Sequence, residues 1–142
     1  MRRRMLKAKI HRATVTDANL HYVGSVSIGP ELLAAADILE NEQVMVVDID
    51  NGSRLETYAI VGKPGEVCLN GAAARLVHVG DKVIILTYAD FEESEVNSHS
   101  PVVIHVDASN NIVDPLVCAA FRLPGLTPPS GTRRRNSIDL PS

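Results

Sequence analysis

The sequence predicts a mainly β fold, a small closed β-barrel with a few short helices, and three observations lead to it. The chain has 142 residues, a length that suits one domain. Apolar and polar residues alternate over short segments, as they do in half-buried strands. Turn residues such as Asn51-Gly52 and Gly80-Asp81 separate these segments at short intervals. Many short strands with frequent turns are typical of barrels, and closure removes the exposed edges that promote aggregation.

The first two predicted elements are strands. Alternation from Met5 to about Thr16 predicts a strand that presents Lys9 and His11 on the same face, because side chains in a strand repeat every two residues. Tyr22 to Ile28 predicts a second, shorter strand, which Gly24 interrupts.

A helix and a hairpin follow. Pro30 suits the first turn of a helix, and the Leu- and Ala-rich segment Glu31 to Leu39 continues it. The β-branched run from Gln43 to Asp50 predicts a strand. Asn51-Gly52 then predicts a type I′ turn, which needs positive φ at both of its central residues.

The return strand of this hairpin is predicted from Ser53 to Val61. It presents Arg54 and Tyr58 on one face and Thr57 on the other, since successive side chains alternate. The later elements are predicted, in order, as a short strand (Val67 to Leu69), a turn or two of helix (Ala72 to Val77), a buried strand (Lys82 to Tyr88), a loop with a helical turn (90–100) and a last strand (Val102 to Val106).

One domain is predicted over residues 1–115. From Leu126 the composition changes to Thr-Pro-Pro-Ser-Gly-Thr and a basic run, and we expect an irregular, disordered tail over 116–142. The basic runs Arg2–Arg4 and Arg133–Arg135 favour solvated, frayed chain ends.

Composition narrows the classes of function. A net charge of -3 gives no electrostatic reason to expect nucleic acid or an anionic membrane, and aromatic residues are only 4% of the chain, with no Trp to stack on bases. No apolar stretch is long enough to span a membrane, and the charged N-terminal segment lacks the apolar part of a signal peptide, so we expect a cytoplasmic protein. The cysteines, Cys68 and Cys118, favour buried free thiols, although a disulfide stays open, and no metal site is expected.

Ser25, which follows Gly24, is the candidate nucleophile. Its hydroxyl can attack the carbonyl of Gly24 and convert the peptide bond into an ester. Elimination then leaves dehydroalanine, which hydrolyses to a pyruvoyl group and ammonia. Gly24 suits the attack because it lacks a Cβ and tolerates strained conformations. The ring intermediate carries an oxyanion that needs a donor, and the hydroxyl of Thr57 could supply it. The products would be residues 1–24 and 25–142.

A ketone at residue 25 would serve amino-acid carbanion chemistry. It would form a Schiff base with a substrate amine, and loss of carbon dioxide would leave a carbanion that Tyr58 could reprotonate. Arg54 can hold a second carboxylate through two N–H groups. A tightly paired α-carboxylate would be slow to leave, so we expect Arg54 to bind mainly the side-chain carboxylate of the substrate. Taken singly, each of these residues has an ordinary structural explanation, and only their joint occurrence favours this chemistry.

The combination resembles one family, the pyruvoyl-dependent aspartate 1-decarboxylases, over roughly residues 1–110. The resemblance lies in Met5–Arg12, Leu20–Ser25, Asn51-Gly52 with Arg54 and Thr57–Ile60, Asn70–Ala74, and Gly80-Asp81 before Val83–Ile85. It implies a six-stranded double-psi β-barrel and a homotetramer with active sites at subunit interfaces. It also implies decarboxylation of L-aspartate to β-alanine, which feeds pantothenate (coenzyme A) biosynthesis. The implied cofactor is a covalent pyruvoyl group made from Ser25, with no metal and no pyridoxal phosphate.

The resemblance also implies residue roles. Ser25 becomes the pyruvoyl group and Tyr58 is the proton donor. Thr57 supports processing and contacts the substrate. The implied processing residues are Gly24, Ser25, Thr57, Tyr22 and His11, and the implied substrate-binding residues are Lys9, Arg54, Thr57, Asn70, Gly71, Ala72 and Ala73.

Some positions depart from the family's pattern. Asn19 stands where aspartate is frequent, Val23 where glutamate is frequent and Arg4 where threonine is expected, and the loop Lys63–Val67 is shorter than in some relatives. None of these removes a group that the mechanism needs. Two other functions stay open: an N-terminal nucleophile hydrolase, in which Ser25 keeps its amine after cleavage, and a non-catalytic binding barrel. The sequence does not determine whether maturation needs a helper protein.

Overall fold

The computed structural model of this protein describes residues 1–113, so the predicted tail and Cys118 lie outside the described residues. The predicted mainly β class is confirmed. The strands are β1 (Arg2–Thr14), β2 (Asp17–Asn19), β3 (Ser25–Ile28), β4 (Gln43–Asp48), β5 (Arg54–Val61), β6 (Val67–Asn70), β7 (Lys82–Glu92), β8 (Val102–Val106) and β9 (Ile112–Val113). The helices are α1 (Pro30–Ala36), the 3-10 helix η1 (Gly71–Leu76) and α2 (Glu93–Val96).

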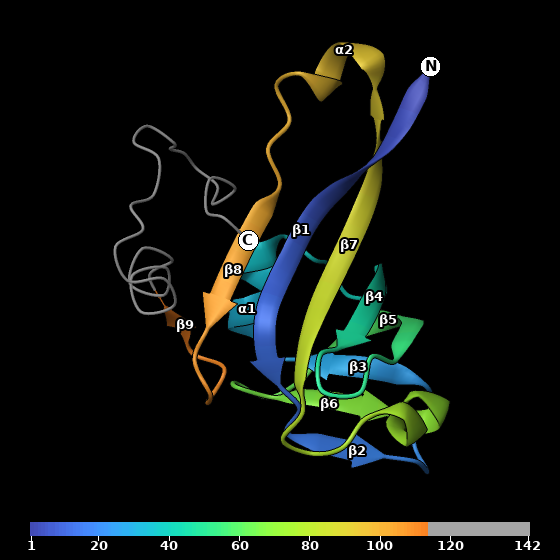
Figure 1. Ribbon diagram of the computed structural model, residues 1–142, viewed down its shortest axis with the longest axis vertical. Helices are drawn as coiled ribbons and strands as arrows, with labels where there is room; N and C mark the ends of the chain where they lie inside the picture. The colour runs from blue at the N-terminus through green and yellow to red at the C-terminus, as the bar shows by residue number, and fades with distance from the viewer. Residues whose placement is uncertain (114–142) are drawn as a thin grey trace.

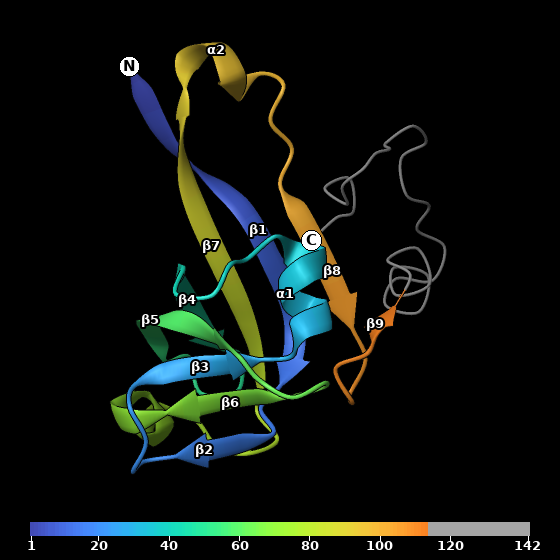
Figure 2. The ribbon, with the colours of Figure 1, turned by 180° about the vertical axis from the view of Figure 1, so that it is seen from behind.

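The strands form a barrel-like sheet. Figures 1 and 2 show β1 and β7 running along the length of the molecule, while β3, β6 and β2 cross its lower end. The order is β2-β6-β3-β5-β4-β7-β1-β8-β9, which is open at β2 and β9 within residues 1–113. The sheet therefore has nine strands where the resemblance implies six, since short strands such as β2 and β9 extend it. The sheet is mixed, with parallel pairs (such as β1 with β8 and β3 with β5) and antiparallel ones (such as β1 with β7 and β3 with β6).

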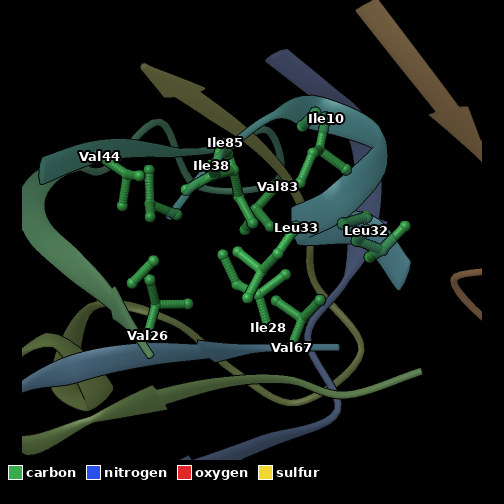
Figure 3. Close-up of a cluster of buried hydrophobic side chains, with 14 of the residues drawn as sticks. Ile10, Val26, Ile28, Leu32, Leu33, Ile38, Val44, Val67, Val83 and Ile85 are labelled. Atoms are coloured by element: carbon green, nitrogen blue, oxygen red, sulfur yellow. The ribbon is translucent and has the colours of Figure 1, made fainter. Parts of the chain in front are cut away.

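The hydrophobic core lies between the lengthwise and the crossing strands. Figure 3 shows Val26 and Val67 below, Val44 and Ile85 above, and Leu33 of α1 between them. All five side chains are buried. Burial of each aliphatic side chain contributes about 1.5–3 kcal/mol, so this cluster holds β3 and β6 against β4 and β7.

The helix α1 ends at Ala36, before the predicted end at Leu39. Asp37 adopts a left-handed φ of 57°, and its N–H bonds to the carbonyl of Ala34 at 3.2 Å. The chain reversal turns Ile38 into the core and leaves Leu39 exposed. Helix propensity alone does not show this turn, because the packing of Ile38 decides it.

The hairpin between β4 and β5 is confirmed, but the predicted type I′ turn is wrong. Gly52 has a φ of 79°, whereas Asn51 is not among the residues with positive φ. The N–H of Asp48 bonds to the carbonyl of Ser53, which makes the loop longer than two residues. The Asp48 carboxylate accepts the N–H groups of Asp50 and Asn51 and so stabilises this wider turn.

The prediction of a frayed N-terminus is also wrong. Residues Arg2–Arg4 form the first part of β1 and pair with the last part of β7, which continues to Glu92 rather than ending at Tyr88. Their side chains form ion pairs with Glu92 (2.9 Å), Glu93 (3.2 Å) and Asp90 (2.9 Å). Exposed ion pairs contribute little, so the backbone ladder to a strand distant in sequence orders this end.

The segment around Gly24 differs from the predicted strand Tyr22–Ile28. Only Ser25–Ile28 pairs as β3, and Tyr22, Val23 and Gly24 are exposed. The sequence does not predict the short strand β2, which precedes the Gly24 segment in the chain and pairs with β6. Within residues 1–113 no helix is long and apolar enough to cross a membrane.

Candidate functional site

Ser25, the candidate nucleophile, is buried at the border of an exposed segment. Ser25 is 1% exposed, although the preceding residue, Gly24, is open to solvent. Ser25 Oγ donates a hydrogen bond to the carbonyl of Val23 at 3.3 Å and accepts one from Asn70 Nδ2 at 2.9 Å. The hydroxyl hydrogen is therefore engaged by the Val23 carbonyl. Because a hydroxyl oxygen has two lone pairs, one stays available for the Gly24 carbonyl carbon.

Asn70 holds Ser25 from the opposite strand. It is the last residue of β6, pairs directly with Ser25 across the ladder and is 2% exposed. Its Nδ2 also donates to Ser27 Oγ at 3.1 Å, and its Oδ1 accepts from Cys68 Sγ at 3.3 Å. With both ends of the amide engaged, the side chain has little freedom to move away from Ser25.

Gly71 supports the segment that precedes Ser25. Its φ is +67°, and a Cβ there would lie 2.6 Å from the Cα and 2.8 Å from the N of Gly24, and 3.0 Å from the carbonyl oxygen of Tyr22. The backbone of 22–24 thus lies directly against the start of η1, which only glycine permits. Gly24 itself has no left-handed φ, and a Cβ on it would meet only the Asn70 carbonyl oxygen, at 3.9 Å. In the observed conformation, the position that sterically requires glycine is Gly71.

The pairing of β5 with β3 brings Thr57 and Tyr58 to the strand next to Ser25. β3 and β5 pair in parallel, with Val26 opposite Ala59. Continued one step back, the register would bring Ser25 level with Tyr58, and a second step, beyond the start of β3, would bring Gly24 level with Thr57. Val26 and Ala59 are buried in the core, so Ser25 and Tyr58 belong to the opposite face of the sheet and Thr57 to the core face.

The predicted cations lie apart from the cluster within one chain. Lys9 and His11 share a face of β1, as predicted, but β1 pairs with β7 and β8 rather than with β3 or β6. Arg54 is exposed at the start of β5. Lys7 Nζ bonds to Glu42 Oε2 at 2.8 Å, whereas neither Lys9 nor Arg54 forms an ion pair with a residue among 1–113.

A surface pocket of about 460 Å³ adjoins Asn70. Tyr22 and Asn70 line it, as do Ser27 and Cys68, which the sequence does not single out. Alternation along β3 and β6 could have found them, because Ser27 shares a face with Ser25, and Cys68 with Asn70. Of the two predicted alanines, Ala72 is exposed and Ala73 packs partly against the core.

Three carboxylates also gather away from Ser25, at the β4–β5 hairpin. Oxygens of Asp48, Asp50 and Asp81 lie within 4.8 Å of one another. Asp48 is 1% exposed, and its Oδ2 has no hydrogen-bond partner among the described residues. Burial, and next the neighbouring Asp81 carboxyl, raises the pKa of Asp48, while the close approach of the Asp48 carboxyl lowers the pKa of Asp81. A hydrogen bond between Asp48 and Asp81, in the direction that the raised pKa of Asp48 implies, would give this oxygen a partner.

We expect Asp48→Asn to remove a pH-dependent loss of stability. A raised folded-state pKa gives a contribution that is complete at low pH and is lost as the pH rises through that pKa. The asparagine amide can donate to Asp81 without titrating. Thermal unfolding followed upward from about pH 4, the ordinary pKa of an aspartate, should show the melting temperature of the wild type rising less, or falling more, than that of the variant. Asp50→Asn, at the exposed position of the same turn, is the control. Equal slopes for all three proteins would contradict the hydrogen bond between Asp48 and Asp81.

Comparison with known proteins points to one family. The family model described as aspartate decarboxylase matches residues 1–113. An aspartate 1-decarboxylase from Desulfitobacterium hafniense is 62% identical over 115 residues, covering 80% of this chain and 91% of the relative. The Clostridium kluyveri protein of that name is 58% identical over 114 residues (79% and 90% covered), and the Campylobacter curvus one is 54% identical over 113 (80% and 98%).

Proposed function

This chain belongs to the aspartate decarboxylase family, and on that premise we propose that it is a self-processing enzyme that converts L-aspartate to β-alanine and carbon dioxide. The observation that carries the proposal is the buried Ser25 hydroxyl, held by Asn70 at 2.9 Å directly after Gly24.

Self-cleavage begins with Ser25 Oγ. The oxygen attacks the carbonyl carbon of Gly24, and the peptide nitrogen leaves as the amine of residue 25, which converts the amide into an ester. Thr57, level with Gly24 if the register continues, is the proposed donor to the oxyanion. Loss of the Cα hydrogen as a proton expels the Gly24 carboxylate and leaves dehydroalanine. One water molecule then hydrolyses its imine form, which gives a pyruvoyl group and ammonia.

The site fits such a group, because position 25 is buried and has an N–H donor, Asn70 Nδ2, beside its side chain. The pyruvoyl group supplies the carbonyl that takes up the substrate amine and accepts the electrons left by carbon dioxide. Tyr58, level with residue 25 if the register continues, is the proposed proton donor. The backbone of Gly71, Ala72 and Ala73 is proposed to line the substrate site.

We further propose a homotetramer in which a neighbouring subunit completes each site. Lys9, His11 and Arg54 lie away from Ser25 in one chain, and the side chains of Lys9 and Arg54 have no ion-pair partner among residues 1–113. Tyr22 and Val23, next to the cleavage point, expose large apolar side chains. Both features suit a subunit interface, where a second chain would cover the apolar residues and bring cations to the substrate carboxylates. A cytoplasmic location and a role in pantothenate biosynthesis are part of the same proposal.

Mass measurement of the purified, aged protein tests the proposal. We expect two fragments, 1–24 and 25–142, with the larger one lighter than a serine-started chain by the elements of ammonia. Borohydride added with aspartate should trap a substrate adduct on the larger fragment, and β-alanine should form without borohydride.

Two other results would each overturn the proposal. A free amine on Ser25 would indicate an N-terminal nucleophile hydrolase, and an uncut chain after prolonged warming would indicate a non-catalytic barrel.

A further inference from the structure

Cys68 is the group that touches the other end of the Asn70 amide. It lies on β6 opposite Ser27 and is 5% exposed. Its Sγ donates to Asn70 Oδ1 at 3.3 Å, a closer contact than the 3.8 Å to the carbonyl of Leu69. Among the described residues, the hydrogen-bond donor to Asn70 Oδ1 is the Cys68 thiol.

The thiol keeps its proton at neutral pH. Burial, and next the negative charges of Asp17 and Glu66, raise the pKa of Cys68 to about 11. A protonated thiol is a donor, whereas a thiolate would repel the Asn70 oxygen.

The donor matters because an asparagine amide can occupy its space in two orientations. In the observed one, Nδ2 faces the hydroxyls of Ser25 and Ser27, and Oδ1 faces the thiol. If the amide turned over, Oδ1 would face the two serines, and the NH₂ group would face sulfur, which accepts hydrogen bonds only weakly. The Ser25 hydroxyl would then donate its hydrogen bond to Asn70 instead of to the Val23 carbonyl. The lone pairs of Ser25 Oγ would point in a different direction from the one they have now.

We propose that Cys68 is a positioning residue for self-cleavage: its thiol fixes the orientation of the Asn70 amide, which in turn holds Ser25 Oγ ready to attack Gly24. The inference rests on the proposed self-processing function and extends it to a residue that does not touch the reacting atoms.

Two substitutions separate this role from simple packing. Cys68→Val fills a similar apolar volume but has no donor, while Cys68→Ser is a poorer apolar filler that keeps an O–H donor. The rate of cleavage would be followed by intact mass in freshly translated full-length precursor. Thermal unfolding of each precursor would show that it folds.

We expect Cys68→Ser to cleave within about threefold of the wild type and Cys68→Val to cleave about tenfold more slowly, the effect of one lost hydrogen bond. Cys68→Ala should be slowed like the valine variant. Cleavage of Cys68→Val at the wild-type rate, or a serine variant as slow as the valine variant, would overturn the inference. If the wild type itself does not cleave, the proposed function fails instead, so the two failures are distinguishable.

Discussion

Ser25→Ala is expected to leave the protein as a single uncut chain of 142 residues with no aspartate decarboxylation. Alanine has no Oγ to attack the Gly24 carbonyl, so neither the ester nor the ketone can form. Intact mass after prolonged warming and a carbon dioxide assay measure the two effects. The loss should be complete rather than partial, since the proposed pyruvoyl group is made from the carbon skeleton of Ser25 itself.

The fold of this variant must be checked independently. Asn70 Nδ2 loses one acceptor and keeps Ser27, which we expect to cost about 1–3 kcal/mol of stability without unfolding the chain. Ser53→Ala, at a half-buried position of the hairpin, is the control and should cleave like the wild type. Cleavage at 24–25 in the Ser25 variant, or measurable turnover, would show that the serine is not the source of the cofactor.

Gly71→Ala should have the second largest effect. The new Cβ would fall 2.6 Å from Gly24 Cα, a contact with backbone that no side-chain rotation can relieve. The φ of +67° adds about 1–2 kcal/mol for a non-glycine residue. The segment 22–24 must then move away from Ser25, so we expect at least a roughly 100-fold slower cleavage, together with a stability loss of about 1–3 kcal/mol for overpacking.

Gly52→Ala is a matched control for this experiment. Gly52 has a φ of +79°, yet a Cβ there meets nothing within 4 Å, so it carries the backbone strain without the collision. Cleavage rates and urea unfolding of the two variants would be compared side by side. If the Gly71 variant cleaves as fast as the Gly52 variant, the contact between Gly71 and Gly24 does not control processing.

Some of the site could be predicted from the sequence, and the limits follow from particular residues. The pair Gly24-Ser25 and its candidate partners are identified by their chemistry and by resemblance. Cys68 and Ser27 are not. Strand alternation could have placed them on the same faces as Asn70 and Ser25, but a cysteine and a serine in apolar strands carry no local signal for their hydrogen bonds to Asn70. The raised pKa of Asp48 is likewise invisible locally, since it depends on burial of one carboxylate beside another.

The linear chain by itself determined the periodic features of this protein: the alternating strands, the proline that begins α1, the hairpin at Asn51-Gly52 and the face shared by Lys9 and His11. Those depend on neighbours one to four residues apart. Only the tertiary structure decided that Asn70 holds Ser25 across 45 residues and that Gly71 supports Gly24. The reason is physical: strand register and backbone close approach are set by the packing of the whole core, and no short segment contains that information.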